Sequence, residues 1–331
     1  MVDGKGKQDA VSAHDAGGKL AEGIMHIWRT QKSLVVLLFV IVILAFLSEH
    51  FFTVYNLINV ARQTSIYAIL AAGMTLVLTV GEIDLSVGSN AGFCGVIAAY
   101  LLKRSISLPL VILIVLGVGL FIGMINGVLT AKIGVPFFVA TLATMSALTG
   151  ASFLITGGYP ISMLPRAWRV FGQGYMWGIP VPVILMIATF IVLQFIQGRT
   201  TFGRRIYAVG SNPRAAYLCG INTDRIRVAA YSLCGFLAAL GGIVMSSRMD
   251  AGDPSAGSTF LMTLVAAPIL GGTKLSGGEG TVFGTLIGAL VLTIMNNGMS
   301  LMNLNIYWQD LARGLIVLGV AIPQIERRLR R

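Results

Sequence analysis

The sequence has few of the residues that carry out catalysis. Its three histidines all lie within the first 50 of 331 residues, so the rest of the chain offers none for a serine–histidine or histidine–metal site. Its three cysteines, Cys94, Cys219 and Cys234, show no metal-ligand spacing. The pattern G-x-x-x-x-G-K-[ST] is absent, so the chain has no P-loop. We therefore expect no enzymatic activity and no cofactor or metal.

Charge is also scarce. Charged residues make up 11% of the chain and apolar residues 56%, whereas about a quarter of a soluble domain is charged. Several stretches of fifteen or more residues carry no ionised side chain. The net charge of +11 does not indicate nucleic acid, because the basic residues gather in loops and ends, at Arg199–Arg227 and Arg327–Arg331. This composition indicates that the chain lies mainly in membrane lipid and not in water.

The apolar segments predict an all-α, polytopic integral membrane protein with about ten transmembrane segments. We place these at residues 33–48, 64–80, 90–102, 108–131, 135–157, 179–197, 228–247, 259–271, 281–299 and 310–325. The positive-inside rule puts both termini and the loop 198–227 in the cytoplasm. The divisions are a polar cytoplasmic tail at 1–32, a transmembrane domain at 33–325 and a basic cytoplasmic tail at 326–331.

The stretch Gly81–Ser89 places two acids, Glu82 and Asp84, and two glycines between two apolar segments that are short for a bilayer crossing. Charge so close to hydrocarbon usually lines a cavity or a protein interior. Part of the pattern returns 190 positions later, at Gly271, Leu275, Ser276 and Gly278, which indicates an internal repeat with broken helices. We expect Asp84 to cap the helix that begins near Ser86.

These features predict a transport pathway. Its candidate residues are Asp84, Ser86, Gly88, Asn126, Ser276, Asn296 and Asn297. The asparagines fit either hydrogen bonding between helices or contact with a substrate, and both remain open. The small-residue pairs Gly119-x-x-x-Gly123 and Gly284-x-x-x-Gly288 predict close helix packing.

Two further segments have an amphipathic or aromatic character. Residues 51–64 predict an interfacial helix that leads into the second span. The outside loop Gly158–Gly178 is rich in tyrosine and tryptophan, which suits either the aromatic belt of a membrane protein or a docking surface.

The inside loop at about 198–227 contains a helix signal. Asn212 is a good N-cap, Pro213 suits the first helical position, and Gly220 suits the end of a helix over 213–219. Such a short basic helix is well built to dock on a soluble partner, although its arginines could also serve only to fix topology. The candidate docking residues are Arg204, Arg205, Asn212, Arg214, Ala215, Ala216 and Gly220.

The pattern Ala215-Ala216-x-x-x-Gly220 resembles the coupling-loop motif of permease subunits in bacterial ATP-driven importers, with Arg214 where that motif usually has Glu. Over roughly residues 30–320 the chain is similar to the ribose-type sugar permeases. The matching stretches include Phe51-Phe52-Thr53, Ile83–Ser89, Gly203-Arg204, Tyr231–Gly235 and Leu270–Thr273. The resemblance implies a homodimer in the bacterial inner membrane that engages an ATP-binding cassette subunit and a periplasmic sugar-binding protein.

One departure bears on the substrate. Ribose-type permeases commonly carry two acids before an Ala-Ala pair in the eighth span, where this chain has Leu261 and Thr263 before Ala266-Ala267. Another pentose, a hexose, a polyol or a furanone-type signal sugar therefore stays open beside ribose. A rival hypothesis is a proton-coupled secondary transporter that uses Asp84 or Glu82. A membrane scaffold or receptor subunit is a third.

Overall fold

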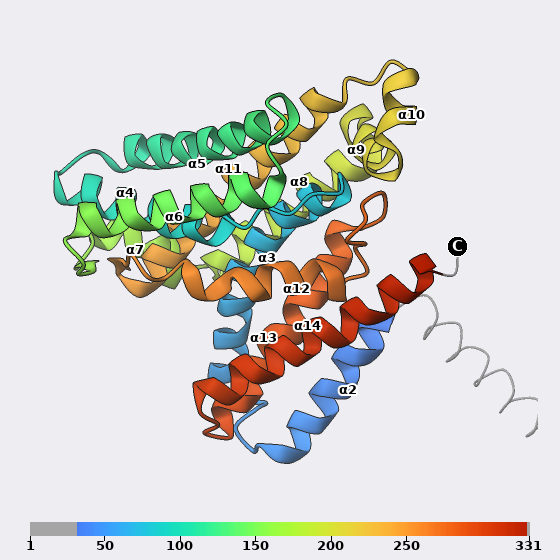
Figure 1. Cartoon of the computed structure of the whole chain (residues 1–331). Coiled ribbons are helices and arrows are strands. Elements are labelled where there is room, and N and C mark those ends of the chain that lie inside the picture. The colour runs from blue at the N-terminus through green and yellow to red at the C-terminus, as the bar shows by residue number, and fades with distance from the viewer. Residues whose placement is uncertain (1–31, 330–331) are drawn as a thin grey trace, which may run out of the picture.

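The computed structural model describes residues 32–329, and almost all of its regular structure there is helical (Figure 1). The helices are α2 (Lys32–Leu47), α3 (Val54–Thr79), α4 (Val87–Lys103), α5 (Leu108–Ala131), α6 (Phe137–Thr156), α7 (Arg166–Gln173), α8 (Val181–Arg199), α9 (Thr201–Ser211), α10 (Pro213–Leu218), α11 (Thr223–Met249), α12 (Leu261–Leu270), α13 (Val282–Leu301) and α14 (Ile306–Leu329). The predicted tail at 1–32 lies almost wholly outside the described residues.

Four strands of two residues form two small antiparallel pairs. β1 (Ile161–Ser162) pairs with β4 (Ala251–Gly252), and β2 (Tyr175–Met176) pairs with β3 (Ile179–Pro180). The first pair ties the segment before α7 to the segment after α11.

Each predicted apolar segment corresponds to a helix of the described chain. Six of these helices, α3, α5, α6, α8, α11 and α13, are long and apolar enough to cross a membrane. Three apolar stretches are shorter, at Leu34–Leu47, Val87–Lys103 and Leu261–Leu270. The chain is a polytopic membrane protein.

The start of α3 differs from the prediction. Residues 54–79 form one continuous helix of 26 residues, so neither a separate interfacial helix at 51–64 nor a short second span exists. Polar side chains of its first turns have internal partners: the Asn56 amide bonds to the Asn297 amide of α13, and Asn59 accepts a bond from Arg248 of α11. These internal partners let a polar helical segment continue directly into the apolar one.

Close helix packing depends on glycine, as predicted. Because lipid is as apolar as a leucine side chain, helices in a membrane associate mainly through van der Waals packing and hydrogen bonds. A Cβ on Gly123 of α5 would lie 2.2 Å from the Tyr231 carbonyl oxygen of α11, and one on Gly288 of α13 would lie 2.0 Å from the Ala267 oxygen of α12. Both predicted small-residue pairs therefore mark real contacts.

The segment between α11 and α12, just before the second copy of the repeated pattern, is not an α-helix. The chain leaves α11 at Asp250 and runs without helix along α4 to Gly257, and the short 3-10 helix η1 (Ser258–Phe260) then leads directly into α12 at Leu261. A Cβ on Gly252 would lie 2.8 Å from the Gly95 carbonyl oxygen, and one on Gly88 would lie 2.3 Å from the Gly257 oxygen. Gly88, a candidate pathway residue, thus provides a close backbone contact.

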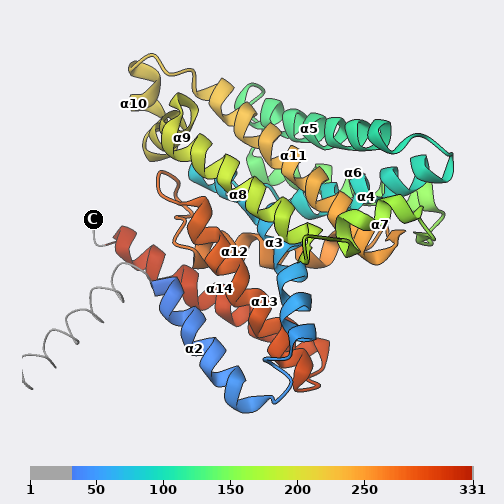
Figure 2. The ribbon, with the colours of Figure 1, turned by 180° about the vertical axis from the view of Figure 1, so that it is seen from behind.

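The two ends of α11 define the two ends of the molecule. α10 lies beyond its N-terminus and α7 packs beside its C-terminus, about 40 Å away for a helix of 27 residues (Figures 1 and 2). The C-terminal end of α14 lies on the same side as α10 in both views. Residues 326–329 of the predicted basic tail belong to the last turn of α14.

Candidate functional site

Asp84 lies in the loop between α3 and α4 with 1% of its surface exposed. Its Oδ1 accepts the Ser86 backbone N–H at 2.9 Å and the Ser86 hydroxyl at 2.6 Å. Asn126 of α5 donates Nδ2 to the Ser86 hydroxyl oxygen at 2.8 Å and lies 3.5 Å from the same carboxylate oxygen. The carboxylate therefore accepts the N–H of Ser86, the residue directly before α4, and its neutral donors compensate for part of the cost of burial.

The network continues into α6. The Thr144 hydroxyl donates to Asn126 Oδ1 at 2.6 Å, so α5 contacts the loop that carries Asp84 and α6 supports that contact. Sequence reasoning missed Thr144, because α6 has several threonines and nothing in their spacing singles this one out. It also missed Asn90, a buried residue of α4 that donates Nδ2 to the Gly119 carbonyl oxygen of α5 at 3.3 Å.

The loop between α12 and α13, which carries the second copy of the repeated pattern, lies against the first. The Gly278 backbone N–H donates to the Thr79 carbonyl oxygen at 2.9 Å. A Cβ on Gly277 would lie 2.8 Å from the Gly81 Cα. Two segments 190 positions apart in the sequence thus meet at one place. Ser276 is exposed on this loop, and its carbonyl oxygen lies 3.6 Å from where a Cβ on Gly81 would be.

The end of α9 packs on both of these loops. A Cβ on Gly210 would lie 1.8 Å from the Thr79 carbonyl oxygen and 2.6 Å from the Gly278 nitrogen. The Tyr207 hydroxyl donates to the Gly280 carbonyl oxygen at 2.6 Å. We call this meeting of Thr79–Gly81, Gly277–Gly280 and Tyr207–Gly210 the inner junction. A glycine is required at position 210 because any side chain there would displace a backbone.

The predicted docking helix is present and starts two residues after α9 ends. α10 spans Pro213–Leu218, and Asn212 Oδ1 accepts the Ala215 N–H at 3.0 Å. Gly220 has φ +79°, the left-handed conformation expected after a helix end. The candidate docking residues Arg204, Arg205, Asn212, Arg214, Ala215 and Gly220 are exposed, whereas Ala216 is buried. Tyr217 and Leu218 are 69% and 78% exposed and add apolar surface to the helix.

Asn297 lies far from the inner junction, near the C-terminal end of α13. Its amide and that of Asn56 bond reciprocally at 2.9 and 2.7 Å. For this residue, hydrogen bonding between helices is therefore confirmed. A pocket of about 390 Å³ opens beside the pair and includes the side chains of Asn59 and Ser300. Asn296 is buried and belongs neither to this pair nor to the Asp84 network.

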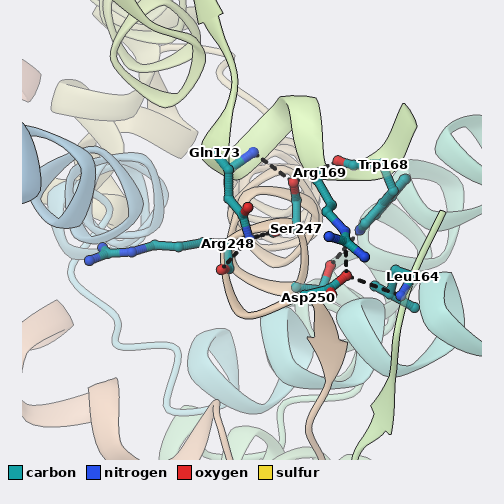
Figure 3. Close-up of polar contacts among 9 residues, drawn as sticks. Leu164, Trp168, Arg169, Gln173, Ser247, Arg248 and Asp250 are labelled. Carbon is teal, nitrogen blue, oxygen red and sulfur yellow. Dashed lines mark hydrogen bonds and ion pairs between the residues drawn. The ribbon is translucent and has the colours of Figure 1, made fainter. Parts of the chain in front are cut away.

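At the opposite end from α10, α7 is clamped across the end of α11 (Figure 3). The Ser247 hydroxyl donates to the Trp168 carbonyl oxygen and accepts the Gly172 N–H, both at 2.6 Å. Arg169 forms a 3.0 Å ion pair with Asp250, which also accepts the Leu164 N–H. The short amphipathic helix α7 is therefore held in a defined orientation, and its own Trp168 side chain is fully buried.

Comparison with known proteins shows the family to which the chain belongs. Residues 56–321 match the family model described as branched-chain amino acid transport system / permease component. The chain belongs to this permease family. It is 41% identical over 292 residues to the ribose import permease protein RbsC of Haemophilus influenzae, which covers 87% of this chain and 90% of that one.

Two further permeases are similar to the chain over most of its length. RbsC of Escherichia coli K12 is 40% identical over 292 residues, with 87% of this chain and 91% of the relative covered. The xylose transport system permease protein XylH of the same organism is 35% identical over 325 residues, with 80% and 83% covered. No solved structure matches the chain. The resemblance to ribose-type permeases that the motifs predicted is confirmed.

Proposed function

We propose that this permease is the membrane subunit of an ATP-driven importer that carries a monosaccharide or related polyol across the bacterial inner membrane. ATP is hydrolysed in a separate ATP-binding cassette subunit. The solute arrives from a periplasmic sugar-binding protein. This proposal extends to the present chain what the names of its relatives say of them.

The observation that carries the proposal is the inner junction. A capped helix with exposed basic and apolar side chains, α10, directly follows a helix that packs on both repeat loops. A soluble partner that moved α10 would therefore push on backbone next to the Asp84 network. No such direct contact would be needed if α10 served only to fix topology.

The orientation follows from the same argument. We propose ten crossings, with the α10 end and both termini in the cytoplasm and the α7 end in the periplasm. The break before α12 supports this count, because the segment 251–257, which is buried except around Asp253 and Ser255, completes the path of a helix only ten residues long. Non-helical backbone at such a depth is tolerated where protein surrounds it.

The α7 region is the platform on which the binding protein docks in this proposal. Its anchoring to α11 supports that role, because a rigid surface loses less entropy on binding than a flexible one. Exposed apolar side chains surround it, including Tyr159, Met163 and Trp177 at 77–88% exposure. They favour docking over a simple aromatic belt for the loop Gly158–Gly178.

We further propose that two copies of the chain assemble as a homodimer. The resemblance to ribose-type permeases supports this. The single chain also exposes large apolar side chains on α2, α6, α8 and α14, which lipid and a second copy would share. The substrate pathway in this proposal includes the Asp84 network, with Ser276, Asn296 and Asn297 as further lining residues.

The substrate class is a polyhydroxylated small molecule. Thr263 is buried and Leu261 lies beside it, at places where ribose-type permeases commonly have acids. Ribose, another pentose, a hexose, a polyol and a furanone-type sugar are therefore all candidates. Affinity measurements on the partner binding protein with this panel would choose among them.

Uptake in reconstituted vesicles tests the function. With the ATPase and binding protein present, sugar uptake should require ATP and survive a protonophore. The rival hypothesis, proton-coupled transport through Asp84 or Glu82, expects the opposite: uptake without the ATPase and collapse with the proton gradient. A scaffold would move no sugar under either condition.

A further inference from the structure

Glu82 is a buried acid outside the Asp84 network. It lies two residues before Asp84 and has 8% of its surface exposed. Its Oε1 lies 3.4 Å from Nε of Arg227 on α11, and the two side chains are 10% and 25% exposed. Among the described residues, neither Glu82 Oε2 nor Arg227 Nε has a hydrogen-bond partner. The pair therefore has Coulomb attraction without the bonds that would lock it.

A second incomplete group lies one helical turn beyond Arg227. Tyr231 is completely buried, and its hydroxyl has no hydrogen-bond partner in the part of the chain that the structure describes. The Glu82 and Asp84 carboxylates both act on it electrostatically, and Glu82 lies close enough for a weak hydrogen bond that falls short of normal geometry. Residues i and i+4 share one face of a helix, so α11 presents two donors to the loop between α3 and α4. The Glu82 carboxylate has one oxygen free to accept from either.

The helix that carries both donors is rigidly joined to α10. The turn between α10 and α11 is closed by bonds from the Ile221 N–H to the Ala216 oxygen at 3.0 Å and from the Gly220 N–H to the Tyr217 oxygen at 2.9 Å. Asn222 then caps α11 by accepting the Arg225 N–H at 3.0 Å. Because hydrogen bonds hold the residues of this connection, a displacement of α10 would be passed on to α11.

We propose that Glu82 and Arg227 form a positioning pair that transmits movement of α10 and α11 to the loop that holds Asp84. In this structure Arg227 is paired with the Glu82 carboxylate by charge alone, at 3.4 Å. When α11 shifts, the Tyr231 hydroxyl takes over the free carboxylate oxygen, and the loop follows. The inference rests on the proposed coupling role of α10. It adds a link that passes through side chains, beside the backbone contacts of the inner junction.

The neutral double variant Glu82→Gln/Arg227→Met separates transmission from stability. A lone buried charge destabilises a fold strongly, whereas removing both charges together is often neutral. We therefore expect each single variant to melt at a lower temperature and the double variant to melt near the parent. Because the link is broken, stimulation of ATP hydrolysis by the loaded binding protein should still fall about fivefold or more in the double variant, in line with ordinary coupling energies.

The matched control is a second acid–arginine pair away from the loops. Asp310 and Arg313 of α14 form a 3.1 Å ion pair, so Asp310→Asn/Arg313→Met removes the same charges. All measurements use the complete transporter in vesicles, with melting temperature, recovery of the ATPase subunit, stimulated hydrolysis and sugar uptake recorded together. The control should keep parental values in all four.

The result that overturns the inference is a double variant with parental stimulation and uptake, because the pair would then serve only folding. Equal loss in the control pair would overturn it as well. Failure of the underlying function looks different: the parent itself would recover no ATPase subunit or show no ATP-dependent uptake.

Discussion

At the scale of single residues, the neutral hydrogen-bond partners of Asp84 indicate its role. Its contacts with the Ser86 N–H, the Ser86 hydroxyl and Asn126 are those of a carboxylate that organises a loop. Burial beside such donors explains why a charge is tolerated at the end of α3. A residue that only faced cytoplasmic water would be exposed, and Asp84 is not.

Asp84→Asn should cut uptake by about tenfold, since weakening charge-assisted bonds by about 1.4 kcal/mol gives that factor. The loss should be the same at every external pH, because it comes from structure and not from proton transfer. Uptake is measured with protein level and melting temperature in parallel. Asp253→Asn is the control, since Asp253 accepts the Ser255 N–H and hydroxyl at 2.8 and 2.7 Å in an exposed loop. Parental uptake by Asp84→Asn at all pH values would refute the pathway assignment.

The Asn56–Asn297 pair is a residue-scale feature of stability. Asn56→Leu leaves the Asn297 amide unpaired in a buried place, which costs roughly 1–3 kcal/mol. The double variant Asn56→Leu/Asn297→Leu leaves neither amide unpaired and should recover much of the loss. The Phe51 carbonyl oxygen, which accepts Asn56 Nδ2 at 2.9 Å, loses that bond in the single and the double variant alike. Melting temperature in detergent checks this. A double variant less stable than either single one would show that the amides have other essential partners.

At the scale of elements, α10 and the turn after it form one unit. Gly220 has φ +79°, and a Cβ there would meet nothing within 4 Å. A tryptophan side chain at this position would therefore not overfill the end of the helix. It would project outward, where the proposed ATPase subunit docks.

Gly220→Trp should therefore insert and fold with a penalty of roughly 1–2 kcal/mol from the left-handed backbone. It should recover less ATPase subunit and lose substrate-stimulated hydrolysis. Gly157→Trp is the matched control for folding and for recovery of the ATPase subunit, because Gly157 also has positive φ and open space but lies at the end of α6 away from α10. Normal hydrolysis and transport by Gly220→Trp would remove the coupling role of α10.

At the scale of the whole molecule, the absence of a P-loop has a direct consequence. Purified alone, the permease should hydrolyse no ATP. Phosphate release is measured on protein freed of copurifying subunits and again after adding the ATPase subunit, which should restore hydrolysis. Robust hydrolysis by the isolated chain would contradict the division of labour proposed here.

Much of the architecture was predictable from the pattern of apolar residues. Charge-free segments must lie in lipid or protein, and the helix signals around Asn212, Pro213 and Gly220 are local, so α10 was placed within one residue of its end. The glycine pairs predicted packing because only a missing Cβ permits such close backbones. The family resemblance was also determined by sequence alone.

Only the tertiary structure decided which distant groups meet. The repeat in the sequence could not reveal that its two loops touch each other and Gly210, since contact across 190 positions depends on how the helices pack. For the same reason the continuity of α3 escaped prediction: its polar first turns are stabilised by Asn297 on α13. Glu82 and Arg227 likewise became partners only when α11 packed beside the first loop, because a buried charge needs a partner that no local pattern specifies.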